Sequence, residues 1–205
     1  MGQYFDNDNL PSNIKEHNVK IFNNEYVFCT DNGVFSKDGL DFGTRLLLES
    51  LPISLMHGDA LDLGCGYGVV SIILSKVTDL NFDGVDVNLR ALHLCEMNVK
   101  RNHSQNVNFF MSNAYENVNK KYDYIITNPP IRAGKDVVYD FLFNAKDHLK
   151  ENGVLYFVIR KEQGAKSCIK DMSLKANIEV VNKKSGFFII KCIFNWQLSF
   201  CMLII

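Results

Sequence analysis

The stretch Asp62-Leu63-Gly64-Cys65-Gly66-Tyr67-Gly68 decides the fold. It follows a short apolar run at residues 60–63 and precedes an apolar helical pattern over residues 69–77, so it predicts a tight turn from a buried strand into a helix. Glycines at alternate positions let the backbone turn sharply and bring its amides close to a ligand at the helix N-terminus. A turn without a ligand is the alternative that this loop alone leaves open.

Short apolar runs and helical patterns alternate along the rest of the chain. We expect strands at residues 82–87, 107–111, 122–127 and 154–160, and helices at 69–77, 89–102, 135–150 and 165–176. Such repetition predicts a parallel sheet with right-handed crossovers. The last two runs, 178–182 and 187–194, are joined too tightly for a parallel crossover and must pair antiparallel. The expected fold is therefore α/β and Rossmann-like, with a mostly parallel seven-stranded sheet whose last strand is antiparallel.

The N-terminal part predicts an appendage to this sheet. Residues 19–22 and 26–30 flank Asn23-Asn24 and favour a β-hairpin. Asp38 and Asp41 are both candidate N-caps for a short helix that Pro52 ends. We expect a single domain over residues 1–205, with the hairpin extension at 1–40, a catalytic core at 41–194 and an apolar tail of unassigned role at 195–205.

Composition limits the classes of function. The chain has 205 residues, 47% of them hydrophobic, and a formal net charge of −1, so any contact with nucleic acid must come from a local basic patch. The six cysteines are scattered and form no Cys-x-x-Cys pair, which argues against zinc and a disulfide framework. We expect reduced, mostly buried thiols in a cytoplasmic protein that is a monomer or weak dimer, without secretory signal, membrane span or metal.

Two carboxylates near the glycine loop predict the ligand. Asp62 suits the ammonium of an amino-acid ligand and would repel a pyrophosphate. Asp86 ends the next strand, at the spacing where an acid reaches the hydroxyls of an adenosyl ribose, although it could also be a helix N-cap. S-adenosylmethionine therefore fits better than a dinucleotide, and a nicotinamide dehydrogenase is the disfavoured alternative. The expected cofactor site comprises Asp62, Gly64, Cys65, Gly66, Gly68, Asp86, Val87, Asn113, Ala114 and Asn128, with Asn113 and Ala114 at the adenine edge unless Asn113 is only a turn residue.

Thr127-Asn128-Pro129-Pro130 follows the strand expected at 122–127. This places it at the carboxyl edge of the sheet, where ligands bind in open α/β folds. An amine conjugated to a base ring is a poor nucleophile, and two acceptors aimed at its hydrogens help to localise the lone pair. The Asn128 side-chain oxygen and the Pro129 carbonyl fit that task, so the expected catalytic residues are Asn128, Pro129 and Pro130. A plain strand-ending turn is the alternative.

These motifs resemble those of the methyltransferase small domain group, which includes 16S rRNA guanine-N2 methyltransferases. The resemblance runs from residue 18 to about residue 191 and includes the glycine loop, Gly33-Val34-Phe35-Ser36-Lys37-Asp38-Gly39-Leu40-Asp41-Phe42-Gly43-Thr44, Asn128-Pro129-Pro130-Ile131-Arg132-Ala133-Gly134-Lys135 and Lys161-Glu162-Gln163-Gly164-Ala165. It implies methyl transfer from S-adenosylmethionine to guanine N2 of rRNA in the small ribosomal subunit. The chain departs from the group in having Ile131 where many amine methyltransferases have an aromatic residue, in lacking the N-terminal domain of two-domain relatives, and in its apolar tail.

Candidate substrate contacts lie in the loops at the same sheet edge. Stacking on the target base is assigned to Phe35 or to the Arg132 guanidinium, since Ile131 has no ring. The full set of expected substrate-binding residues is Phe35, Ile131, Arg132, Lys135, Arg160 and Lys161, and Lys183 and Lys184 extend the basic rim. Three alternatives stay open: an adenine-N6 methyltransferase, a protein-glutamine methyltransferase, and a non-catalytic S-adenosylmethionine-binding factor of ribosome assembly.

Overall fold

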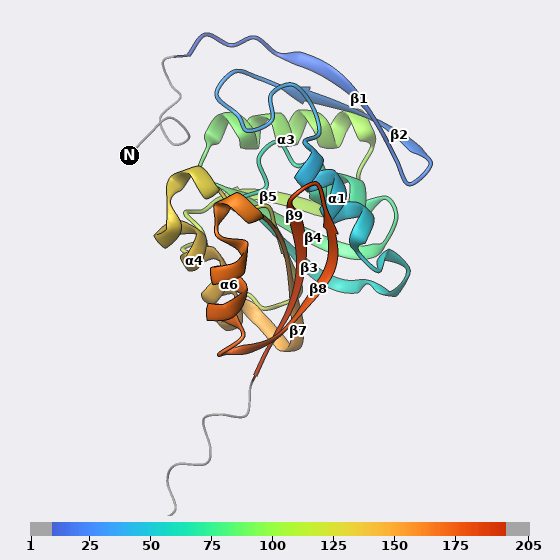
Figure 1. Cartoon of the computed structure of the whole chain (residues 1–205). Coiled ribbons are helices and arrows are strands. Elements are labelled where there is room, and N and C mark those ends of the chain that lie inside the picture. Colours follow the sequence, from blue (N-terminus) through green and yellow to red (C-terminus); the bar gives the residue numbers. More distant parts are fainter. Residues whose placement is uncertain (1–9, 196–205) are drawn as a thin grey trace, which may run out of the picture.

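The computed structural model describes residues 10–195. Its main feature is a seven-stranded sheet in the order β5-β4-β3-β6-β7-β9-β8 (Figure 1). The strands are β3 (His57–Leu63), β4 (Asp79–Asp86), β5 (Val107–Met111), β6 (Tyr122–Thr127), β7 (Leu149–Arg160), β8 (Ala176–Lys184) and β9 (Phe187–Phe194). The first five pair in parallel, and β9 runs antiparallel to both β7 and β8. The predicted sheet and its antiparallel last strand are confirmed.

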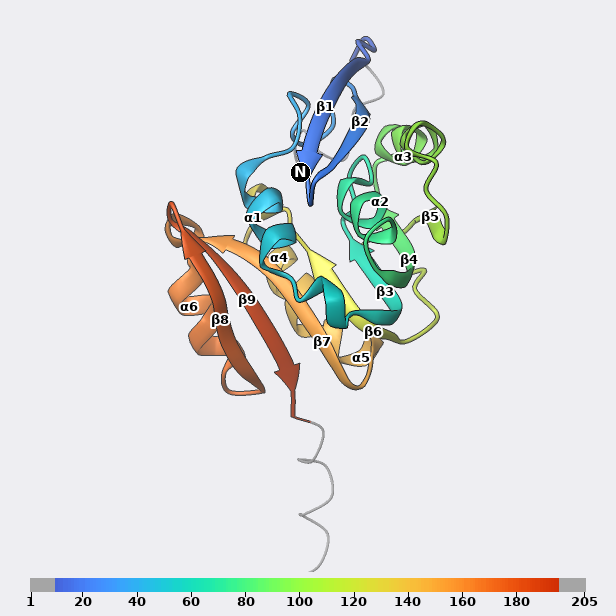
Figure 2. The same ribbon diagram turned by 90° about the vertical axis from the view of Figure 1, so that its right-hand side faces the viewer.

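Helices cover both faces of the sheet (Figure 2). On one face lie α1 (Phe42–Ser50), α2 (Val69–Ser75) and α3 (Leu89–Asn102), which share one apolar core with Ala60, Phe82 and Ile126 of the sheet. On the other face α4 (Lys135–Phe143), α5 (Ala145–His148) and α6 (Ala165–Met172) share a second core with Leu61 and Phe157. Neighbouring strand residues point to opposite faces, which is why Ala60 and Leu61 belong to different cores.

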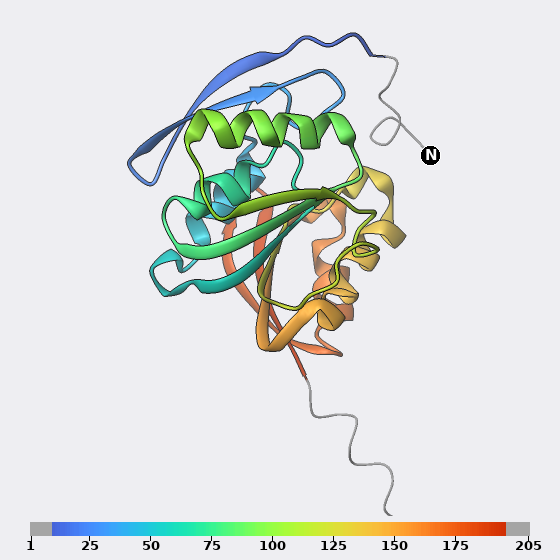
Figure 3. The same ribbon diagram turned by 180° about the vertical axis from the view of Figure 1, so that it is seen from behind.

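The predicted N-terminal hairpin is present as β1 (Lys15–Ile21) and β2 (Asn24–Thr30), a separate two-stranded sheet. It lies over α3, which crosses this side of the molecule lengthwise (Figure 3). The amide of Asn98 on α3 exchanges two hydrogen bonds with the backbone of Cys29, at 2.6 and 3.0 Å, and Asn102, one turn later, does the same with Val27. Two asparagines therefore attach the hairpin through the backbone of β2.

Two expected helices end several residues earlier than predicted: the one expected at 165–176 is α6 and ends at Met172, because Ala176 already begins β8. The helix expected at 135–150 ends at Phe143 and a short α5 follows, because Leu149 is already extended, fully buried and paired with Tyr122. Pairing and burial in the sheet override the helical pattern there. Of the two candidate caps for α1, Asp41 caps the helix: its Oδ1 accepts from the amides of Gly43 and Thr44 at 2.9 and 3.1 Å. Asp38 does not cap it.

Three short 3₁₀ turns, Ile53–Leu55, Ile131–Ala133 and Lys161–Gln163, connect these elements. The five described cysteines are free and buried, as the sequence predicts, and Cys201 lies outside the described residues, as does nearly all of the apolar tail. Between residues 10 and 195, no helix is long and apolar enough to cross a membrane, and no three metal-ligating side chains gather at one place.

Candidate active site

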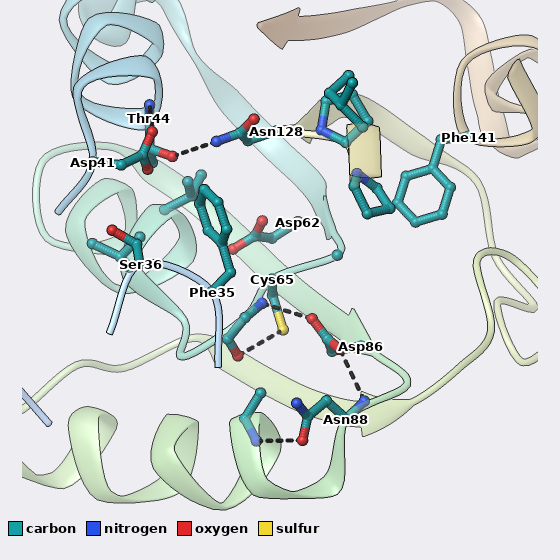
Figure 4. A pocket seen from close by; sticks show the side chains of 18 of the residues that line it. Phe35, Ser36, Asp41, Thr44, Asp62, Cys65, Asp86, Asn88, Asn128 and Phe141 are labelled. Atoms are coloured by element: carbon teal, nitrogen blue, oxygen red, sulfur yellow. Dashed lines mark hydrogen bonds between the residues drawn. The ribbon is translucent and has the colours of Figure 1, made fainter. Parts of the chain in front are cut away.

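A cavity of about 360 Å³ opens at the carboxyl ends of β3, β4, β6 and β7. The glycine loop, the residues after β4 and the Asn-Pro-Pro motif line it, and the segment before α1 covers one side through Phe35, Ser36 and Asp41. Its volume is in the range of small-molecule sites. The parallel topology therefore brings to one place motifs that are far apart in the sequence (Figure 4).

The glycine loop presents its backbone to this cavity. Gly64 and Gly66 have φ angles of 72° and 54°, and a Cβ added at Gly66 would meet no atom within 4 Å, so the loop is open on the cavity side. Gly68 differs, because a Cβ there would lie 2.9 Å from the Phe109 ring and the residue does not line the cavity. Gly68 was expected in the cofactor site, but its place is behind the loop, where close packing requires a glycine.

Asp62 is a buried carboxyl group at the cavity wall, with 2% of its surface exposed. Its Oδ2 accepts hydrogen bonds from the Ser71 amide at 3.1 Å and the Ser71 hydroxyl at 2.9 Å, and Oδ1 has no partner among the described residues. Burial, followed by the nearby negative charge of Asp86, raises its pKa to about 7 in spite of the Ser71 bonds. An unpaired buried carboxyl oxygen at a cavity is suited to a cationic ligand group, which fits the ammonium of S-adenosylmethionine.

Asp86 ends β4 and lines the cavity beside the loop. Its Oδ2 accepts from the Gly66 amide and its Oδ1 from the Asn88 amide, both at 2.9 Å, so the backbone holds the carboxylate in one orientation. Burial raises its pKa, and these amide bonds oppose the shift. Asp86 is not the N-cap of α3, because Asn88, two residues later, caps that helix. Asp86 is therefore available for a ligand.

The residues after β5 also contribute to the wall of the cavity. Asn113 and Ala114 both line it, together with Ser112 and Val87. The Asn113 amide nitrogen is already bonded to Glu116 Oε1 at 2.9 Å. The Asn113 side chain keeps its second N–H and its amide oxygen for an adenine edge.

Asn128 lies just beyond β6, where its side chain contacts helix α1. Its Nδ2 donates to the hydroxyl of Thr44, a buried residue in the first turn of α1, at 2.9 Å (Figure 4). The amide oxygen of Asn128 is then the unused acceptor of a side chain that lines the cavity. The Pro129 carbonyl accepts from the Ile131 amide at 2.8 Å and keeps a second lone pair. Two acceptors on the wall of a cavity of about 360 Å³ are suited to methyl transfer to an amine.

Of the expected substrate contacts, Phe35, Ile131, Arg132 and Arg160 line the cavity, whereas Lys135 and Lys161 do not. Lys135 lies over the Tyr139 ring, with its Nζ 4.6 Å from the ring centroid, and Lys161 is exposed at the end of β7. Reasoning from strand ends missed the part of the wall that comes from α1 and β9. Its members are Asp41, Phe42, Thr44 and Phe187. Two sequence signals lay close to them: the helix cap at Asp41 and the motif over residues 33–44, which contains three of the four residues.

The sheet order, the reversed last strand and a glycine-loop cavity at the carboxyl edge define the class of S-adenosylmethionine-dependent methyltransferases with a Rossmann-like fold. Within this class the chain belongs to the methyltransferase small domain family, whose model matches residues 25–191. S-adenosylmethionine is the cofactor of that family.

Similar proteins agree with this assignment. The chain is 40% identical to the uncharacterized protein YbxB of Bacillus subtilis (strain 168), over 92% of this chain and 96% of that protein. It is 32% identical to the ribosomal RNA small subunit methyltransferase C of Psychromonas ingrahamii, over 88% of this chain and 52% of that protein, so it spans about half of that relative. A solved 16S rRNA N2 methyltransferase of T. thermophilus, in complex with AdoMet and guanosine, has the same fold, with a TM-score of 0.76, 24% identity and coverage of 91% of this chain and 52% of the other.

Proposed function

We propose that this chain methylates the exocyclic N2 amine of a guanine in the 16S rRNA of the small ribosomal subunit. The observation that carries the proposal is the orientation of Asn128. Because its amide nitrogen is tied to Thr44 at 2.9 Å, its amide oxygen is held as an acceptor in the cavity before a substrate enters. Such an acceptor can bind the N–H group of an incoming amine. A protein that only binds S-adenosylmethionine does not require this acceptor.

The acceptor pair suits an amine that is conjugated to a ring. When the Asn128 Oδ1 and the Pro129 carbonyl accept the two hydrogens of the amine, the nitrogen lone pair is turned out of conjugation and toward the electrophile. Oriented acceptors of this kind contribute about 10²–10³ in rate. No strong base is required: the carbon–nitrogen bond would form as the carbon–sulfur bond breaks, S-adenosylhomocysteine would leave as a neutral thioether, and the cationic methylated amine would then lose its proton to solvent.

S-adenosylmethionine supplies an electrophilic methyl group on its sulfonium. Asp62 would accept from the ammonium through its unpaired oxygen, and Asp86 from the ribose hydroxyls through the lone pairs that Gly66 and Asn88 leave free. The open backbone at Gly66 admits the ligand, and Asn113 and Ala114 lie where the adenine would end. These residues position the donor between the glycine loop and Asn128.

The choice of 16S rRNA is supported by the relatives and by charge. The relatives with 32–33% identity are small-subunit rRNA methyltransferases, and the T. thermophilus enzyme is a 16S rRNA N2 methyltransferase solved with guanosine. Exposed cations follow three strands at the edge that holds the cavity: Arg132, Lys135, Arg160, Lys161, Lys183 and Lys184. Cations of this kind contact phosphates and position RNA. In this proposal the protein works in the cytoplasm as a monomer or weak dimer, and the target base leaves its stack to reach Asn128.

Tritiated S-adenosylmethionine offered with 30S subunits, naked 16S rRNA, 50S subunits and a release factor tests the substrate. Nucleosides are then separated by mass spectrometry, with subunits taken from cells that lack the gene. We expect N2-methylguanosine in the small-subunit samples. Label in N6-methyladenosine or in the protein factor would overturn the guanine assignment and leave methyl transfer standing. Intact cofactor binding with no label in any sample would support a non-catalytic assembly factor.

Two substitutions test the role of Asn128. Asn128→Ala should leave cofactor affinity nearly unchanged and lower kcat about 100-fold or more, because the lost contact belongs to the transition state. Thr44→Val should lower kcat about tenfold by releasing the Asn128 amide. Thr44→Ser, which keeps the hydroxyl, should have a kcat near that of the wild type. Thr78→Val is the matched control, since the Thr78 hydroxyl bonds to Leu74 O at 2.7 Å away from the cavity. Wild-type kcat in Thr44→Val would exclude the positioning role.

A further inference from the structure

Two phenylalanine rings are exposed at the cavity. Phe35 and Phe42 have 47% and 42% of their surface exposed, and they are the only aromatic residues among the large exposed hydrophobics between residues 10 and 195. Six other phenylalanines, including Phe28 and Phe157, are buried. Exposure of an apolar ring costs free energy, and both exposed rings line the same cavity. This coincidence indicates a partner for the rings that folding alone does not provide.

Phe42 belongs to a cluster built from three elements. Its ring centroid lies 5.3 Å from that of Phe187 at the start of β9, with an interplanar angle of 49°. The guanidinium carbon of Arg160, at the end of β7, lies 4.8 Å from the Phe187 centroid. All three side chains line the cavity. The distances are those of aromatic and cation–π pairs, so the cluster offers π-faces and a fixed cation together.

The Phe187 ring packs against the backbone of a glycine in α1. A Cβ added at Gly43, in the first turn of α1, would lie 2.8 Å from Cε1 of Phe187. Any larger residue at this position would displace the ring. The ring therefore lies against the helix backbone and beside Phe42, and its place does not depend on a flexible loop.

The same helix turn fixes the cluster and the acceptor. Phe42 is the first residue of α1, and Thr44, two residues later, holds the amide of Asn128. Phe42, Thr44 and Asn128 all line the cavity, so a planar group that brings its amine to the Asn128 oxygen enters the same cavity as the ring of Phe42. Ile131, the residue after the Asn-Pro-Pro motif, also lines the cavity and contributes an aliphatic surface without a π-face.

We propose that Phe42, Phe187 and Arg160 form the stacking site for the target base. This inference rests on the proposed function and sharpens it: a base ring has two π-faces to stack on the cluster, whereas the side chain of a protein glutamine has only a small amide. The cluster thus favours a nucleic-acid substrate over a protein one. Stacking of a base on an aromatic side chain is sequence-tolerant, so discrimination between guanine and adenine belongs to other groups.

The test replaces the ring of Phe42, which is exposed and therefore tolerates substitution. Phe42→Leu is compared with Phe42→Tyr, which keeps a ring, and with Phe143→Leu. Phe143 is a matched control because its ring also forms a tilted aromatic pair, with its centroid 5.2 Å from that of Tyr139 and an interplanar angle of 47°, but does not line the cavity. Melting temperature and cofactor affinity are measured for each variant and should stay at the wild-type values.

Two readouts separate this inference from the proposed function. The first is kcat/KM for methylation of 30S subunits, which should fall about tenfold in Phe42→Leu, mainly through KM, and stay near wild type in Phe42→Tyr and Phe143→Leu. The second is quenching of 2-aminopurine in a single-stranded RNA oligonucleotide, which needs stacking and no turnover. Phe42→Leu should lose this quenching.

Wild-type KM and wild-type quenching in Phe42→Leu would overturn the stacking site even if the subunits are methylated. Ring-dependent quenching without methylation of any subunit would overturn the rRNA assignment and leave the stacking site standing. Loss of both signals in Phe143→Leu as well would show a general effect of losing a ring, and would also count against the site.

Discussion

At the scale of single residues, we expect Asp62 to couple ligand binding to protonation. The sequence predicts it as a partner for a cationic ligand, because it lies two residues before the first glycine of the loop. Its environment could not be predicted, since the burial and the Ser71 contacts that set its pKa come from the packing of α2. Thr44 and Phe42 lie in the motif over residues 33–44, but they could not be assigned as site residues from it, because nothing in α1 shows that it will lie beside β6 and β9. A residue near a strand end can be predicted as part of a site, and one that arrives by packing cannot.

We expect the affinity for S-adenosylmethionine to fall as the pH is lowered below about 7. The folded-state pKa of Asp62, about 7, lies above the ordinary value of 3.8, so the ligand-free protein binds a proton at Asp62 below neutral pH. This raised pKa means that the ligand-free protein loses stability as the pH rises from about 4 to about 7. An ammonium favours the ionised carboxyl, so binding below pH 7 releases that proton and weakens by up to about tenfold per pH unit.

Calorimetric titration at pH 6 and pH 8, in buffers with different ionisation enthalpies, measures both the affinity and the proton release. Asp62→Asn should bind weakly and lose the pH dependence, whereas Asp86→Asn should bind weakly and keep a pH dependence that is moved to lower pH, because the charge of Asp86 no longer raises the pKa of Asp62. An affinity that does not change between the two pH values would remove Asp62 from the ammonium site.

At the scale of elements, the sequence predicted those with a strong local pattern. The limits of α3, β5 and β6 agree with the expected 89–102, 107–111 and 122–127. The helix expected at 135–150 was wrong near its end, because the pairing of Leu149 with Tyr122 depends on a strand 27 residues away in the sequence. Contacts between distant segments also explain how the hairpin is attached: Asn98 bonds to Cys29 on β2 and to the carbonyl of Tyr67 in the glycine loop, at 2.9 Å.

Asn98→Ala should destabilise the protein by about 2–4 kcal/mol, because it leaves buried backbone groups of Cys29 and Tyr67 without partners. It should also weaken cofactor binding, since the glycine loop loses a support. Asn102→Ala is the control: Asn102 bonds to Val27 in the same way but does not contact the loop. Urea unfolding and cofactor titration of both variants test this link. Equal cofactor affinity in the two variants would show that the hairpin and the loop are not coupled through Asn98.

At the scale of the whole molecule, a formal net charge of −1 conceals an uneven distribution of charge. The sequence could predict that cations follow the strands at one edge, because parallel strands all end on the same side. The structure adds that only Arg132 and Arg160 line the cavity, while Lys135, Lys161, Lys183 and Lys184 lie outside it and are exposed. An acidic group offsets part of this positive charge, since Nε of Arg160 lies 3.6 Å from Oε2 of Glu162. The exposed lysines are thus suited to phosphates around the target base, and the two arginines to the base itself.

Neutralising two of these lysines should weaken RNA binding in a salt-dependent way. In Lys183→Gln/Lys184→Gln, binding of a 16S rRNA transcript should weaken at low salt, and the slope of log K against log salt should become less steep by about 1–2, since each phosphate contact contributes about 0.7–0.9. Cofactor affinity should not change, because neither lysine lines the cavity. The matched control is Lys76→Gln/Lys100→Gln, which removes the same charge from two exposed positions that do not line the cavity, the C-cap of α2 and the last turn of α3. Equal slopes for the two double variants would show that the RNA responds to total charge rather than to this edge of the sheet. A shallower slope in the first variant alone would place RNA phosphates beside the turn that joins β8 to β9, next to the ring of Phe187.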